Sequence, residues 1–187
     1  IRLVKNTTIA YLDCFSGVSG DMLLGALLHA GLDQELLLAE LDKLDGVDFK
    51  LIANREVRCG IGCQHVTITS PSRQKLRHFP QILTLLDKSS LAPEIVDRAG
   101  MIFTLLAKAE AKVHDVALDK IHFHEVGAVD TIIDIVGTLI GLHQLGIDQL
   151  VCSPLPMGRG LVRCSHGNLP LPAPAVCELL TNVPVYG

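Results

Sequence analysis

One long amphipathic segment constrains the fold of this 187-residue chain more than any other feature. Between residues 93 and 114, apolar side chains recur at spacings of three and four, which is the period of a helix with one buried face. The members of this stripe are Ile95, Ala99, Ile102, Leu106, Ala109 and Val113. A helix of this kind is stabilised mainly by packing, so the rest of the chain must supply a core around it.

Strand and helix patterns alternate on both sides of this segment. Residues 8–15 are typical of a buried strand, which a small-residue turn links to a helix that Asp21 begins as N-cap. We expect further helices at 33–44, 80–87, 129–145 and 174–182, a hairpin within 49–69, and extended segments at 151–156 and 170–174. This mixture predicts an α/β (or α+β) fold, in which a mixed sheet is flanked by helices.

Composition excludes several functional classes. Hydrophobic residues make up 49% of the chain and the net charge is −4, which argues against disorder and against a basic surface for nucleic acid. Apolar runs stay well short of the roughly 20 residues that span a membrane. Six cysteines without a dense pattern, and no export signal, predict reduced thiols in the cytoplasm. We expect a single domain over 1–187, the N-terminal fragment of a longer protein, and the sequence is compatible with a homo-oligomer.

The turn between the first strand and the first helix is a candidate anion site. Backbone N–H groups at a helix start bind phosphate, and glycines let a ligand approach closely. The residues that would line this site are Ser16, Gly17, Ser19 and Gly20. Asp13 and Asp21 flank it and could hold a cation beside the phosphate. The alternative is an ordinary strand–turn–helix connection.

The sequence His122-Phe123-His124-Glu125 is a candidate metal site. On a strand, the two histidines project from the same face, and imidazole suits nickel, zinc, copper and iron. Glu125 could act as a ligand or as a base. The alternative is a pair of surface histidines on either side of a packed Phe123.

The helix that follows carries carboxylates and glycines on one side. At about 100° per residue, Asp130 and Asp134 share a narrow stripe with two glycines, Gly137 and Gly141. This stripe predicts close approach of a polar group, with the carboxylates as further metal ligands. His143 lies on the apolar side and is interpreted as structural.

Two further segments carry weaker signals. Arg159, between two glycines, could contact a phosphate or carboxylate, and His166 lies in a polar turn after it. Cys59, Cys63 and His65 could bind zinc, although the glycines among them favour a plain hairpin.

Four segments together resemble one protein family, the nickel-insertion proteins of the LarC type. They are DCFSGVSGDMLLGALL at 13–28, AKAEAKVHD at 107–115, IHFHEVGAVDTIIDIVG at 121–137 and SPLPMGRGLVRCSHGNLPLPAPAVCELL at 153–180. The resemblance covers nearly the whole chain in order. It implies insertion of nickel into a pyridinium bisthiocarboxylate mononucleotide, the precursor of the nickel-pincer cofactor of lactate racemase.

The resemblance also implies what the reaction requires. Metalation of the ring expels a proton, so a base is needed, and Glu125 is the candidate. CTP with Mg²⁺ or Mn²⁺ is expected to bind the C-terminal part, which this chain lacks, because family members are about twice as long. Many members also carry a His-rich tract where this chain has only residues 70–78.

Two other functions are consistent with the residues. The chain could be a nickel-binding carrier module without catalysis of its own. It could also be a zinc hydrolase built on His122, His124 and Glu125, which would need one more ligand and an open water position.

Overall fold

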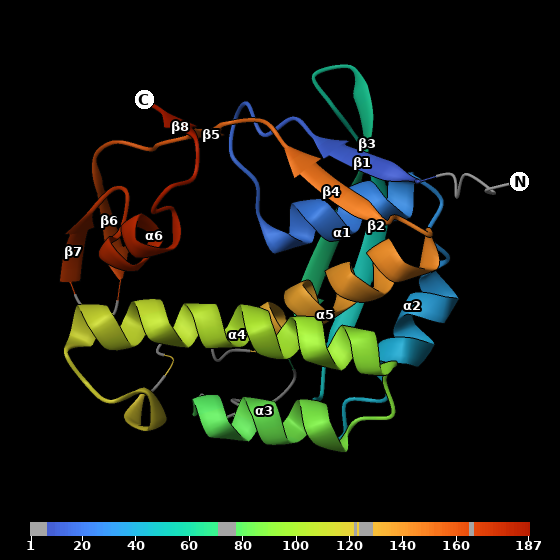
Figure 1. Cartoon of the computed structure of the whole chain (residues 1–187). Helices are drawn as coiled ribbons and strands as arrows, with labels where there is room; N and C mark the ends of the chain where they lie inside the picture. Colours follow the sequence, from blue (N-terminus) through green and yellow to red (C-terminus); the bar gives the residue numbers. More distant parts are fainter. Residues whose placement is uncertain (1–6, 71–77, 122, 124–128, 165–166) are drawn as a thin grey trace, which may run out of the picture.

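The computed structural model describes residues 7–70, 78–121, 123, 129–164 and 167–187, and it has the mixed α/β fold that the sequence predicts (Figure 1). The helices are α1 (Gly20–His29), α2 (Gln34–Leu41), α3 (Phe79–Lys88), α4 (Pro93–His114), the 3₁₀ turn η1 (Leu118–Lys120), α5 (Val129–Gln144) and α6 (Pro174–Leu179). The bounds of α4 are those expected from its apolar stripe. The helices α2 and α6 each end three residues earlier than predicted.

The strands pair in twos. They are β1 (Ile9–Leu12), β2 (Lys50–Arg58), β3 (Ile61–Thr69), β4 (Gln149–Cys152), β5 (Leu155–Pro156), β6 (Leu161–Cys164), β7 (Gly167–Pro170) and β8 (Val185–Tyr186). β1–β4 and β5–β8 are parallel, whereas β2–β3 and β6–β7 are antiparallel. Within the described residues, the mixed parallel and antiparallel pairing that the sequence predicts is divided among four two-stranded sheets.

The first strand is also less buried than its sequence suggested. Ile9 is 56% exposed and Tyr11 is 63% exposed. Within the described residues, β1 pairs only with β4, and the side chains of β4 are exposed along its whole length. A buried strand needs a cover on both faces, and no described helix supplies one here.

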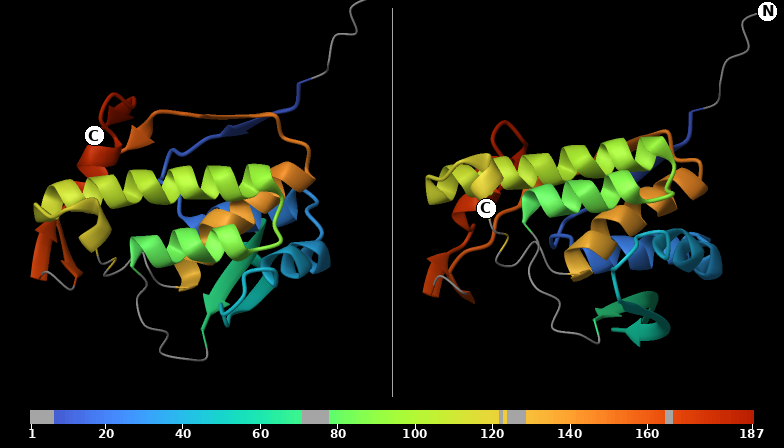
Figure 2. Two further views of the ribbon diagram at one scale, coloured as in Figure 1. Left: turned by 60° about the horizontal axis from the view of Figure 1, so that its bottom comes forward. Right: turned by 90° about the horizontal axis from the view of Figure 1, so that it is seen from below.

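Helix α5 is the centre of the core. It contacts α1, α2 and α4, and nine of its residues are buried. Figure 2 shows α3 and α4 side by side, with α5, α1 and the β2–β3 hairpin on the same side of this pair. The arrangement explains why α5 carries few polar side chains, because a helix enclosed by others is apolar around most of its surface.

The two glycines of α5 have a packing role, which corrects the sequence interpretation. A Cβ atom on Gly137 would lie 3.0 Å from Leu24, and one on Gly141 would lie 2.8 Å from Leu27. The glycines therefore let α1 approach α5 closely and do not face a polar ligand. His143 is corrected as well, because its side chain is 49% exposed and lies 3.9 Å from Glu94.

The hairpin turns tightly at Cys59 and Gly60. Both residues have positive φ, 51° and 80°, as expected for the two-residue turn that matches the twist of paired strands. The turn fixes the register, so that Glu56 lies opposite Cys63 and Asn54 lies opposite His65. The predicted hairpin is therefore confirmed.

The C-terminal strands and α6 lie at the far end of α4 (Figure 1). Lys112 of α4 forms an ion pair of 2.6 Å with Glu178 of α6. Tyr186 of β8 donates a hydrogen bond of 3.1 Å to the carbonyl of Phe15. These contacts join the C-terminal segment both to α4 and to the loop that precedes α1.

Candidate functional site

Two helices begin side by side at the candidate site. Gly20, Leu24 and Leu27 of α1 lie against Asp134, Gly137 and Gly141 of α5, respectively. Residue numbers rise together in the two helices, so α1 and α5 run parallel and their N-terminal ends point the same way. The helix starts near Asp21 and Val129 therefore open toward one region.

Close approach at these helix starts depends on a glycine. A Cβ atom on Gly20 would lie 2.4 Å from both Cβ and Cγ of Asp134, far inside normal contact distance. Only a residue without a side chain fits at this position. The carboxylate of Asp134 is thereby pressed against the first turn of α1.

A pocket of about 490 Å³ collects the carboxylates at this end of the helix pair. Asp21 comes from α1, Asp130 and Asp134 come from α5, and β3 closes the other side with His65 and the next three residues. Three of the predicted metal ligands therefore share one pocket. His65 was predicted only within the weak zinc motif, and it belongs to this pocket instead.

The neighbouring carboxylates and the burial of Asp134 affect its protonation. Burial, together with the smaller effect of the nearby charges of Asp21 and Asp130, raises the pKa of this carboxyl to about 6. Its Oδ1 atom is buried, and no hydrogen-bond partner for it exists among the described residues. A proton or a cation would relieve both the repulsion and the missing contact.

Asp21 lies two positions further into α1 than the N-cap position predicted for it. The helix begins at Gly20 with Ser19 as N-cap, so Asp21 occupies the first turn. Its Oδ1 atom accepts hydrogen bonds from the Met22 N–H, at 2.9 Å, and from the Ser19 hydroxyl. A carboxylate in the first turn is stabilised by the helix dipole, and here it occupies the place where an anion would bind.

The remaining predicted residues lie outside this pocket or outside the described residues. The exposed loop from Ser16 to Ser19 precedes α1, and Asp13 follows β1. Arg159 lies beside Gly187, where a Cβ atom would be 3.7 Å from its Nη2. His122, His124, Glu125 and His166 fall outside the described residues.

Phe123 is buried and packs edge-on against Phe79, as the packed-Phe123 alternative expected.

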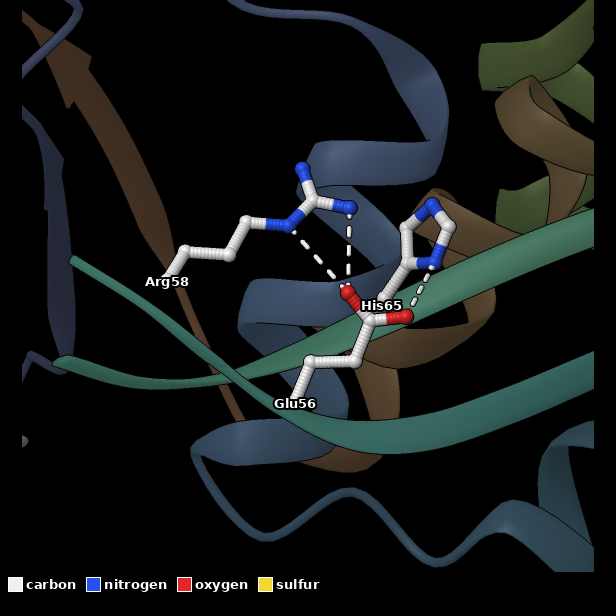
Figure 3. Close-up of polar contacts among 3 residues, drawn as sticks. All are labelled: Glu56, Arg58 and His65. Carbon is white, nitrogen blue, oxygen red and sulfur yellow. Dashed lines mark hydrogen bonds and ion pairs between the residues drawn. The ribbon is translucent and has the colours of Figure 1, made fainter. Parts of the chain in front are cut away.

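A polar triad on the hairpin was not predicted. Glu56 accepts hydrogen bonds from Nε and Nη2 of Arg58 at 3.2 and 3.1 Å, and its other oxygen lies 3.0 Å from Nδ1 of His65 (Figure 3). Arg58 and, to a smaller extent, His65 hold the pKa of Glu56 below its ordinary value. Because a carboxylate can only accept, Nδ1 of His65 carries the proton, and Nε2 is left as the ring's other nitrogen.

The sequence did contain a signal for this triad. A two-residue turn at Cys59 and Gly60 places Glu56 opposite Cys63, so His65 is the diagonal neighbour of Glu56 on the same face. Diagonal pairs of this kind are within reach of long side chains. Cys59, Cys63 and His65 do not gather as the zinc motif required, and among the described residues no three His, Cys, Asp or Glu side chains are arranged to hold a metal ion.

Fold and pocket together define a class of protein. It is a mixed α/β protein in which parallel helices bring three carboxylates, Asp21, Asp130 and Asp134, into one pocket. The chain belongs to the family described as nickel insertion protein, whose profile matches residues 10–187. No solved structure matches the chain.

Similar proteins carry consistent names. The chain is 53% identical to a "Putative nickel insertion protein" of Desulfotalea psychrophila, over 96% of the chain and 46% of that protein. It is 48% identical to a "Pyridinium-3,5-bisthiocarboxylic acid mononucleotide nickel insertion protein" of Desulfitobacterium hafniense, over 95% of the chain and 44% of that protein. A protein of the same name from Geobacillus kaustophilus is 44% identical, over 95% of the chain and 46% of its own length.

The chain therefore spans less than half the length of the curated relatives it matches. In the part of the chain that the structure describes, no helix combines the length and the apolar character needed to cross a membrane.

Proposed function

We propose that this chain forms the nickel- and precursor-binding part of a protein that inserts nickel into pyridinium-3,5-bisthiocarboxylic acid mononucleotide. The observation that carries the proposal is the family assignment, since close relatives bear this activity in their names. The carboxylate pocket between α1 and α5 supports it, because carboxylates that repel one another favour a bound cation. Family membership also favours nickel chemistry over a zinc hydrolase.

In this proposal, nickel is a substrate that must be held loosely before transfer. The ligands would be His122 and His124 together with carboxylates of the pocket, Asp21, Asp130 and Asp134, and Asp13 is a further candidate from the sequence. A mixture of imidazole and carboxylate suits nickel without the tight grip of thiolates. The sequence candidates for the phosphate contact are Ser16, Gly17, Ser19 and Gly20 in the loop before α1, and Arg159 with His166 later in the chain.

The chemistry requires a proton acceptor. Formation of the carbon–nickel bond replaces a ring C–H bond, and the proton must leave to a base, for which Glu125 is the proposed residue. CTP with Mg²⁺ or Mn²⁺ would bind the part of the longer protein that lies outside this chain. The full-length protein would then act as a nickel chelatase of the lyase class in the cytoplasm.

Nickel titration by calorimetry tests the metal assignment. His122→Ala with His124→Ala should weaken Ni²⁺ binding at least tenfold, or about 1.4 kcal/mol. His29→Ala with His143→Ala is the matched control, since both of these histidines are exposed and lie outside the carboxylate pocket. Unchanged nickel affinity in a folded His122/His124 variant would contradict the assignment.

A turnover assay distinguishes the enzyme hypothesis from the carrier hypothesis. The chain is mixed with Ni²⁺, CTP, Mg²⁺ and the precursor, with and without the remaining part of a longer relative. Product formed only when the other part is present supports a divided enzyme. Nickel binding without product in either mixture supports the carrier alternative.

A further inference from the structure

A second, larger pocket adjoins the carboxylate pocket. It is a groove of about 640 Å³ between α1 and the β2–β3 hairpin. Its walls are mainly apolar, with Met22 and Ala26 on α1 and Ile61 and Val66 on β3. Groove size and lining match those of small-molecule sites, which are largely apolar with a few polar groups.

The groove and the carboxylate pocket share residues. Asp21, His65 and Val66 line both, so the two spaces meet at the start of α1. The Gly25 backbone lies close to the Gln64 carbonyl, where a Cβ atom would be only 2.5 Å from the oxygen. The tight contact fixes the distance between the two walls.

The groove carries different ionisable groups at its two ends, and the guanidinium at one of them is paired with Glu56. Asp21 lies at the end shared with the carboxylate pocket, whereas His29, two turns later in α1, lines only the groove. The rise of a helix separates these two positions by about 12 Å. Arg58, next to the hairpin turn, also lines only the groove. One end is therefore acidic, and the other carries a guanidinium and an imidazole.

We propose that this groove binds the pyridinium mononucleotide, with the phosphate toward Arg58 and the pyridinium ring toward His65 and Asp21. The inference rests on the proposed function, and it adds where the precursor lies and which way it points. The orientation brings the thiocarboxylates next to the carboxylate pocket, where nickel would have to reach them. A flat ring can pack between the apolar side chains of α1 and β3, and the phosphate meets a positive charge.

The guanidinium of Arg58 is held in position for a contact with the phosphate. Glu56 engages its Nε and Nη2 atoms, which fixes the guanidinium plane and leaves Nη1 pointing away from Glu56 (Figure 3). A side chain held in place loses less entropy when it binds an anion. The loop before α1 is a poorer phosphate site, because the Asp21 carboxylate already accepts the bonds at that helix start.

Protection of a cysteine tests the groove in the unaltered chain. Cys63 lines the groove, whereas Cys59 lies in the hairpin turn and Cys152 in β4. Nicotinic acid mononucleotide serves as the probe, because it combines a pyridinium ring, a carboxylate and a phosphate. At saturating probe, iodoacetamide should alkylate Cys63 at least threefold more slowly, with Cys59 and Cys152 unchanged, as read by mass spectrometry. Equal rates at Cys63 with and without the probe would overturn the proposal.

Substitutions then test the orientation by calorimetry with the same probe. Arg58→Ala should weaken binding at least tenfold, whereas Arg55→Ala, the same change on an exposed residue of the same strand outside the groove, should have little effect. Ala26→Phe should fill the groove and abolish binding, and Ala39→Phe on the exposed face of α2 is its control.

Two results would overturn the groove site. In one, the probe binds unchanged to the Arg58→Ala and Ala26→Phe variants but not to Gly17→Val, which places the phosphate in the loop before α1. In the other, the wild-type chain does not bind the probe. Ni²⁺ titration of the same samples reports separately on the proposed function, so a failed groove and a failed nickel site are distinguishable.

Discussion

The two halves of the α1–α5 contact use the same stripe of α5 in opposite ways. In the first half, Asp134 faces a pocket and presses against Gly20. In the second half, Gly137 and Gly141 are buried against leucines of α1 and α2. The glycine that permits the close approach is Gly20 of α1 in the polar half, whereas Gly137 and Gly141 of α5 have this role in the apolar half.

This contrast shows what a glycine on a helix stripe means. Its small size reports a close neighbour but does not say whether that neighbour is a ligand or another helix. The carboxylates and the glycines of α5 share one stripe by periodicity, yet only the carboxylates face a pocket. The leucines of α1, which determine this, lie more than a hundred residues earlier in the sequence.

The largest expected effect comes from the apolar half. Leu24 is fully buried at the contact with Gly137, so Leu24→Ala should lower the free energy of unfolding by about 2–5 kcal/mol. Met22 of the same helix is 61% exposed, and Met22→Ala should change it by less than about 0.5 kcal/mol. Urea titration followed by circular dichroism measures both. Equal losses in the two variants would mean that the two halves do not differ in burial.

Local patterns predicted most of the fold. The apolar stripe of α4 gave both of its bounds, and the glycines Gly60 and Gly62 indicated the hairpin, whose turn lies at Cys59 and Gly60. These features depend on neighbours a few residues away, so the sequence displays them. The pairing of β1 with β4 joins residues about 140 positions apart, and no local pattern reports whether such a strand is covered.

The site was predictable to a similar degree. Asp21, Asp130 and Asp134 were singled out by type and spacing, and they share one pocket. Glu56, Arg58 and His65 were not grouped, because each is an ordinary residue of an exposed hairpin and only the cross-strand register brings them together. The groove that Arg58 and His65 help to line depends on the tertiary contact of α1 with β3.

A smaller effect on stability is expected in the polar half, at the start of α1. Gly20→Ala should lower the free energy of unfolding by about 1–3 kcal/mol, because the added methyl group overlaps Cβ and Cγ of Asp134. Gly137→Ala is the comparison, since its new methyl group would meet the ends of leucine side chains, at 3.0 Å from Leu24 and at an ordinary 3.7 Å from Leu37 and Leu41. The helix propensity gained there, about 1 kcal/mol, should offset most of that strain. If Gly137→Ala lowers the free energy of unfolding more than Gly20→Ala does, the closer approach of the two helices lies in the apolar half instead.

The smallest effect concerns the charge of Asp134. The folded state raises the pKa of this carboxyl from 3.8 to about 6, so the folded chain binds the extra proton and stability falls as the pH rises through that interval. Asp134→Asn removes the ionisation and should raise the free energy of unfolding at pH 7 by about 1 kcal/mol, allowing for solvent screening. The gain should vanish near pH 3, where the carboxyl is mostly neutral in both states. Asp97→Asn, on the exposed side of α4, makes the same charge change away from the pocket and should show no such pH dependence. A loss of stability at pH 7 in Asp134→Asn would mean that the pocket stabilises the ionised carboxylate, contrary to the repulsion inferred for the polar half.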